Sequence, residues 1–116
     1  MSKATKDLLE FWEDQLKLSH TSSNYFFRKS PSHYHMMLIV MHAYKYNLGL
    51  SVEELKTKLF KTSRPKSALM IKEACDKKFF ILEKKGKDNR KKYVTPTPNF
   101  VNEFNDYLKV LSNLSF

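Results

Sequence analysis

The stretch SVEELKTKLFKTSRPKSALMIKEACDKK, Ser51–Lys78, decides the fold that we predict for this chain. It opens with Ser51 and, three residues later, Glu54, which is the pattern of a helix-capping box. A short helix should follow and should end in the segment KTSRPK. Pro65 disfavours helical geometry at Arg64 but suits the first turn of a new helix, which we expect to run to the end of the stretch. Two short helices joined by a sharp turn form a helix-turn-helix arrangement.

A β-hairpin is predicted directly after this pair of helices. The runs FFILEK and KKYVTP, residues 79–84 and 91–96, have the composition of strands. Gly86 and the pair Asp88-Asn89 lie between them and are typical hairpin-turn residues. A hairpin that follows a helix-turn-helix is a wing, and its tip would be the basic segment 84–92.

Three further helices complete the predicted order. The first covers Lys6–Leu18, the second starts at Ser30-Pro31 and ends at Asn47-Leu48-Gly49, and the last covers Asn99–Leu114. The fold class is therefore mainly α with a small β-hairpin (α+β), in one domain over residues 1–116. A winged-helix core would occupy residues 31–97, with helical segments at 5–29 and 98–116.

The positive charge of the chain is concentrated in one segment. The net charge is +9, and residues 55–92 alone hold 14 Lys/Arg and four acidic residues, a net of +10. Such segregation favours an anionic partner, above all nucleic acid. The charge does not distinguish duplex DNA from RNA as the partner, because both carry phosphate groups.

The helix over residues 64–78 is the predicted recognition helix, which would enter the major groove of DNA. Its inward residues are predicted to be Ala68, Ile71, Cys75 and Phe79. Candidate contacts to DNA are the outward residues of this helix and the cations and amide of the wing, which would reach the minor groove. They are Arg64, Lys66, Ser67, Met70, Lys87, Asn89, Arg90 and Lys91.

Asp88 is the one acidic residue of the wing tip and has two interpretations. Its carboxylate would repel DNA, so it could instead hold the guanidinium of Arg90 in place through a bidentate pair. Alternatively, it only shapes the turn, as aspartate often does.

The wing sequence resembles that of MarR-type regulators, and the chain is similar in length to their SarA-like members. That family carries Asp and Arg in the wing, then Val and Thr-Pro, and this chain has them at the same offsets: Asp88, Arg90, Val94, Thr97 and Pro98. Asn89, Phe79, Pro96 and Phe100 depart from the family pattern. The resemblance implies a homodimer formed through the terminal helices, a recognition helix at 64–78, and Arg90 as the wing arginine supported by Asp88.

Other kinds of site are weaker candidates. The four histidines (His20, His33, His35 and His42) lack a nearby carboxylate or cysteine partner set, so no metal is predicted. Cys75 is expected to be an inert, inward-facing thiol. No catalytic constellation and no cofactor motif stand out, so the chain is not predicted to be an enzyme. An aromatic set could line a small-molecule effector pocket, although core packing is the commoner role: Trp12, Tyr25, Phe26, Phe27 and Tyr34.

We therefore predict a sequence-specific regulator that binds double-stranded DNA as a homodimer. The alternatives are a winged-helix module that binds RNA or protein, and a non-specific architectural DNA-binding protein. A single cysteine and a longest apolar run of six residues, Met36–Met41, indicate a cytoplasmic protein with no membrane span.

Overall fold

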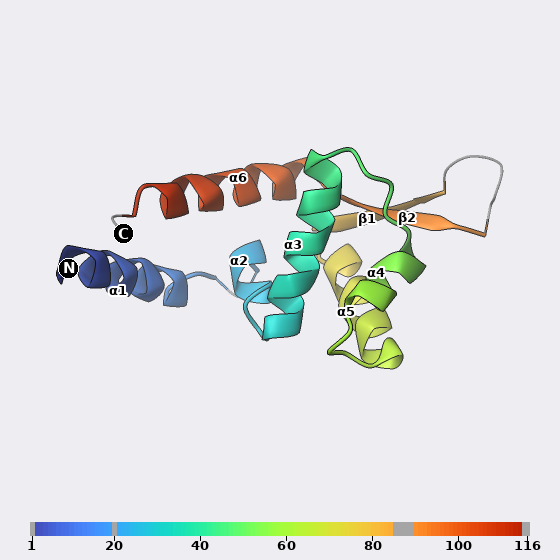
Figure 1. Ribbon diagram of the computed structural model, residues 1–116, viewed down its shortest axis with the longest axis horizontal. Coiled ribbons are helices and arrows are strands. Elements are labelled where there is room, and N and C mark those ends of the chain that lie inside the picture. The colour runs from blue at the N-terminus through green and yellow to red at the C-terminus, as the bar shows by residue number, and fades with distance from the viewer. Residues whose placement is uncertain (1, 20, 85–89, 115–116) are drawn as a thin grey trace.

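The computed structural model describes residues 2–19, 21–84 and 90–114. The helices and strands follow one another in the order shown in Figure 1. Their bounds are α1 Ser2–Leu16, α2 Ser23–Phe26, α3 Pro31–Lys45, α4 Val52–Lys58, α5 Arg64–Asp76, β1 Phe80–Lys84, β2 Lys92–Pro96 and α6 Pro98–Ser112. The predicted α+β class, mainly helical with one antiparallel hairpin, is thereby confirmed.

The molecule is elongated, with extents of 55 × 27 × 24 Å. Helices α1 and α6 project to one side together with both ends of the chain, and the hairpin projects to the opposite side (Figure 1). Helix α3 lies between them and contacts both α4 and β2. The hairpin pairs Phe80 with Pro96 at its base and Lys84 with Lys92 at its outer end.

A short segment before α4 extends the hairpin sideways. The amide of Val94 donates to the carbonyl of Leu50 over 2.8 Å, and Ser51 forms an isolated antiparallel bridge with Tyr93. The same serine caps α4: its hydroxyl accepts from the amide of Glu54, whose carboxylate accepts from the amide of Ser51. The capping box is thus confirmed, and the start of α4 lies against the middle and outer part of β2, at Val94 and Tyr93.

The other long helices after α1 also begin at hydroxyl caps. Ser30 caps α3 and Ser63 caps α5, in each case ahead of a proline in the first turn. Thr97 caps α6 and does more, because its hydroxyl donates to the carbonyl of Lys78 over 2.8 Å and its amide donates to the carbonyl of Phe79 over 2.9 Å. Thr97 therefore ties the start of α6 to the end of α5.

Two helices end in left-handed residues that are not glycine. The end of α3 was predicted at Asn47-Leu48-Gly49 as a glycine stop, but the left-handed residue there is Asn47, with φ 55°, and not Gly49. Asparagine tolerates this conformation because its short side chain bonds locally. Lys78, with φ 65°, ends α5, and the amide of Phe79 then donates back to the carbonyl of Ala74 over 2.9 Å. Both ends have the hydrogen-bond pattern of a Schellman motif.

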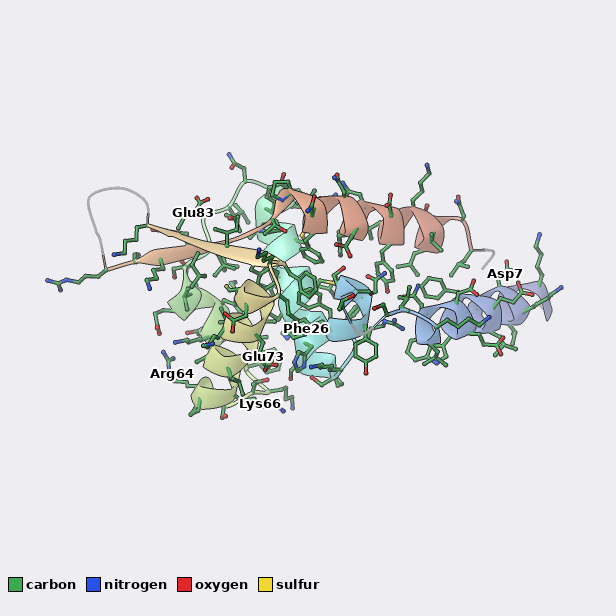
Figure 2. All side chains as sticks on the ribbon, turned by 180° about the vertical axis from the view of Figure 1, so that it is seen from behind. Asp7, Phe26, Arg64, Lys66, Glu73 and Glu83 are labelled. Atoms are coloured by element: carbon green, nitrogen blue, oxygen red, sulfur yellow. The ribbon has the colours of Figure 1, made fainter. Side chains whose placement is uncertain are left out.

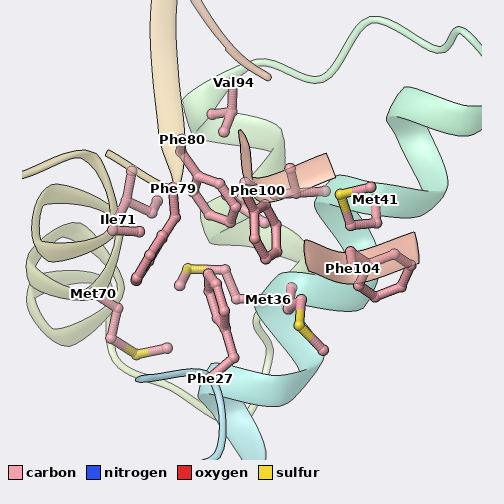
Figure 3. Close-up of a cluster of buried hydrophobic side chains, with 14 of the residues drawn as sticks. Phe27, Met36, Met41, Met70, Ile71, Phe79, Phe80, Val94, Phe100 and Phe104 are labelled. Atoms are coloured by element: carbon pink, nitrogen blue, oxygen red, sulfur yellow. The ribbon is translucent and has the colours of Figure 1, made fainter. Parts of the chain in front are cut away.

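The core is built around phenylalanine rings from three distant parts of the chain (Figure 3). Phe27 lies 5.6 Å from Phe79, 5.5 Å from Phe80 and 5.1 Å from Phe100, measured between ring centroids. These separations are typical of favourable aromatic pairs. Phe26 and Phe27 are completely buried. The cluster joins α2, the junction of α5 with β1, and the first turn of α6.

Replacing Lys78 by glycine should stabilise the protein. A lysine in the left-handed region costs about 1 kcal/mol, which glycine does not pay. We expect Lys78→Gly to raise the free energy of unfolding by up to about 1 kcal/mol in urea denaturation. The matched control is Lys77→Gly, because Lys77 is the preceding lysine with an ordinary φ of −83°. The control should lower stability; equal effects of the two variants would contradict the assigned strain.

Candidate nucleic-acid interface

Helix α5 has one buried face and one exposed face, and they differ in part from those predicted: Ile71 and Phe79 are buried as expected. The buried residues of the helix are Ser67, Met70, Ile71 and Ala74. Opposite them the exposed residues are Pro65, Ala68, Leu69, Lys72 and Asp76, and Arg64 and Lys66 are exposed between the two sets. At about 100° per residue these sets lie on opposite sides of the helix. The exposed side chains are therefore free to contact a binding partner.

Two of the predicted DNA contacts are wrong for this reason. Ser67 is completely buried and Met70 is only 2% exposed, so neither side chain can reach a base edge. Ala68, predicted to face inward, is exposed. The predicted and the observed inward sets share Ile71, and the observed one includes Met70 and Ala74 in place of Ala68.

Arg64 and Lys66 remain on the surface of α5 as predicted. They flank the exposed face on either side, and Figure 2 shows both at the periphery of the molecule, whereas Phe26 lies inside it. Arg64 is paired with the carboxylate of Glu53 in α4. Lys56 and then Arg64 hold the pKa of Glu53 below its ordinary value by hydrogen bonding to its carboxylate. Glu53 therefore stays ionised and holds the guanidinium against α4.

Lys72 is a candidate that the sequence analysis did not include. It lies on the exposed face and donates to Asp76 over 2.8 Å, which raises the pKa of Lys72. Lys72 and Asp76 form an exposed ion pair between residues one helical turn apart, and such pairs contribute little to the stability of a protein. Lys72 can therefore exchange Asp76 for an external anion at small cost.

The hairpin carries further exposed cations. Lys84, Arg90, Lys91 and Lys92 are exposed at its outer end. Lys87, Asp88 and Asn89 lie outside the described residues, so the predicted pair between Asp88 and Arg90 stays a prediction. The hairpin is anchored in the core by Val94, the middle residue of β2, which is 4% exposed. A rigid base of this kind sets the direction in which the basic outer end points.

The predicted aromatic pocket is divided between core and surface. Phe26 and Phe27 belong to the core, while Trp12 and Tyr25 line a surface hollow of about 350 Å³ together with Arg28 and Lys29. The guanidinium carbon of Arg28 lies 5.1 Å from the ring centroid of Trp12. A small-molecule effector at this hollow stays a prediction.

The remaining titratable candidates show no clustering. Within the described ranges, no group of three or more His, Cys, Asp and Glu side chains is arranged to hold a metal ion. Cys75 is half-buried, and burial, followed by the charge of Asp76, raises the pKa of its thiol. A raised thiol pKa lowers the thiolate fraction and with it the nucleophilicity.

The terminal helices expose a large apolar surface. In α1, three apolar residues at helical spacing face away from the core, with Leu9 57%, Trp12 48% and Leu16 65% exposed. Phe11 packs against the core, where its ring lies 6.0 Å from that of Tyr107 in α6. On α6, Leu108 and Val110 are 40% and 49% exposed. An apolar surface of this extent is typical of an interaction site.

No protein-family model matches the chain, and neither the curated proteins nor the solved structures contain a match to it. The resemblance of the hairpin to MarR-type regulators therefore stays a prediction from the residue pattern. In the part of the chain that the structure describes, no helix is both long and apolar enough to cross a bilayer.

Replacing Ser67 by alanine distinguishes the buried position from the predicted contact. The hydroxyl of Ser67 is buried without a hydrogen-bond partner among the described residues. Ser67→Ala removes that unpaired group and should raise the free energy of unfolding by about 1 kcal/mol. Ser63→Ala is the control, because it removes the cap of α5 and should cost about 1 kcal/mol. Weaker nucleic-acid binding by Ser67→Ala at unchanged stability would contradict the burial argument.

Proposed function

We propose that this protein is a sequence-specific regulator that binds double-stranded DNA as a homodimer. The observation that carries the proposal is the exposed face of α5, which follows the capped helix α4 and has Arg64 and Lys66 on its two flanks. An exposed helix with flanking cations suits the major groove, because bases lie at the groove floor and phosphates along both its edges.

The arrangement of α3, α4, α5 and the hairpin supports a winged helix-turn-helix assignment. The bridge between Ser51 and Tyr93 places the start of α4 beside the outer part of β2, and α5 contacts β1. The basic end of the hairpin, including Arg90 and Lys91, then serves as the wing, which contacts the minor groove or phosphates beside the major-groove site.

A second copy of the chain is the partner that we propose for α1 and α6. These helices lie at the end of the molecule opposite the hairpin (Figure 1), so a dimer formed there leaves both copies of α5 accessible. The exposed residues of α1, among them Leu9 and Leu16, recur at helical spacing and would be covered. Two-fold symmetry would then be matched by a palindromic DNA site with half-sites about one turn apart.

Removing single cations tests contact with phosphate. Lys66→Ala and Arg90→Ala should each weaken binding and lower the slope of log K against log salt by about 1 per chain. Fluorescence anisotropy over a series of salt concentrations measures this slope. Lys109→Ala is the matched control, since Lys109 is exposed on α6 far from α5 and should leave the slope unchanged. An unchanged slope in Arg90→Ala would remove the hairpin from the interface.

Introducing a charge on the apolar face of α1 tests the dimer. Leu9→Glu places a carboxylate in the proposed interface and should yield monomers by sedimentation velocity, with helix content retained because Leu9 is exposed. Phe60→Glu introduces the same charge at a side chain 74% exposed outside α1 and α6, and should remain dimeric. A wild-type chain that sediments as a monomer would refute the dimer directly.

Selection of bound duplexes from a random pool separates the proposal from its alternatives. Enrichment of a palindromic motif supports the sequence-specific dimer. Duplex binding without enrichment indicates an architectural protein, and preference for structured RNA at equal salt indicates an RNA-binding module. The salt concentration must be stated, because phosphate contacts make every such affinity depend on it.

A further inference from the structure

The centre of the exposed face of α5 is apolar, although the helix lies in the most basic part of the chain. Pro65, Ala68 and Leu69 occupy the first two turns of this face, and Leu69 is 55% exposed. Exposing a leucine to water between charged neighbours gains nothing for the isolated chain. The residue instead makes sense as a contact to an apolar group on a partner.

Two cations of α5 are paired with carboxylates. Arg64 is held by Glu53 on α4, and Lys72 pairs with Asp76 along the helix axis. Bidentate recognition of guanine requires an arginine or lysine that points at the groove floor. In the first two turns, between Arg64 and Lys66, the exposed side chains are those of Pro65, Ala68 and Leu69, so this part of the face offers apolar groups rather than N–H donors.

The major groove presents one apolar group on its base edges, the C5-methyl of thymine. We propose, resting on the function proposed above, that Ala68 and Leu69 contact thymine C5-methyl groups and thereby select half-sites with thymine at the positions facing the first two turns of α5. Arg64 and Lys66 then bind phosphates on either side. Sequence discrimination comes from methyl contacts and phosphate affinity from the flanking cations.

Removal of the methyl group from the DNA tests this inference. The selected duplex is prepared with deoxyuridine in place of thymidine at each half-site position in turn, which deletes the C5-methyl and preserves base pairing. Each methyl contact should be worth about fourfold in affinity, so symmetric replacement in both half-sites should weaken binding by about sixteenfold. At least one thymine position in each half-site should show this loss, measured by anisotropy at fixed salt.

Protein variants assign the contact to α5. Leu69→Ala should bind the thymine duplex more weakly and lose most of the discrimination against deoxyuridine at one position. Lys72→Ala, on the same exposed face, should keep that discrimination while binding more weakly overall.

Equal affinity for thymine and deoxyuridine duplexes, or an undiminished penalty in Leu69→Ala, would overturn the methyl contact and leave the DNA-binding function standing. Absence of any selected duplex would overturn both. A selected half-site made only of G·C pairs would also refute the inference, because it contains no thymine methyl.

Discussion

The buried contact of Phe27 with Phe79, Phe80 and Phe100 is the constraint on which the arrangement of the molecule depends. Phe79 and Phe80 are adjacent in the chain, and both are buried because the helix ends in a left-handed residue just before them. Their rings pack in one cluster, although Phe79 follows the end of a helix and Phe80 starts a strand. The angle between α5 and the hairpin is therefore set in the core, and the two elements present their outer surfaces as one rigid unit.

Helix α5 separates its charged residues from its exposed apolar residues, and the two kinds of side chain make different demands on geometry. Coulombic attraction to phosphate is long-ranged and tolerant of geometry, whereas contact between methyl groups requires close approach. Arg64 and Lys66 stand on the flanks of the helix and Leu69 at its centre. The flanking cations are suited to orient the helix on an anionic surface before the central side chains meet their targets.

Local signals in the sequence predicted local structure well. The serine caps and the proline starts each act within a few residues, so the long helices and the two strands follow from the sequence, whereas the short helix α2 was not predicted. The face that α5 turns inward depends on what α3 and α2 offer it, and that is tertiary information. Ser67 and Met70 were assigned to the wrong side for this reason. The stop at Asn47 was missed because glycine nearby offered a commoner solution. The apolar residues of α1 recur at helical spacing in the sequence, but this periodicity does not say whether the core of the same chain or a second molecule covers them.

Thr97 gives the molecule a mechanical property. Its hydroxyl and amide bind the carbonyls of Lys78 and Phe79, and the same hydroxyl accepts from the amide of Phe100 in the first turn of α6. One residue thus fastens the end of α5 to the start of α6, and α6 extends from that point as a stiff arm. If two copies assemble through α6, a small rotation of α6 at its C-terminal end would be transmitted through Thr97 to α5. In such an assembly, the three hydrogen bonds of Thr97 would limit how far α5 of one copy can move relative to α5 of the other.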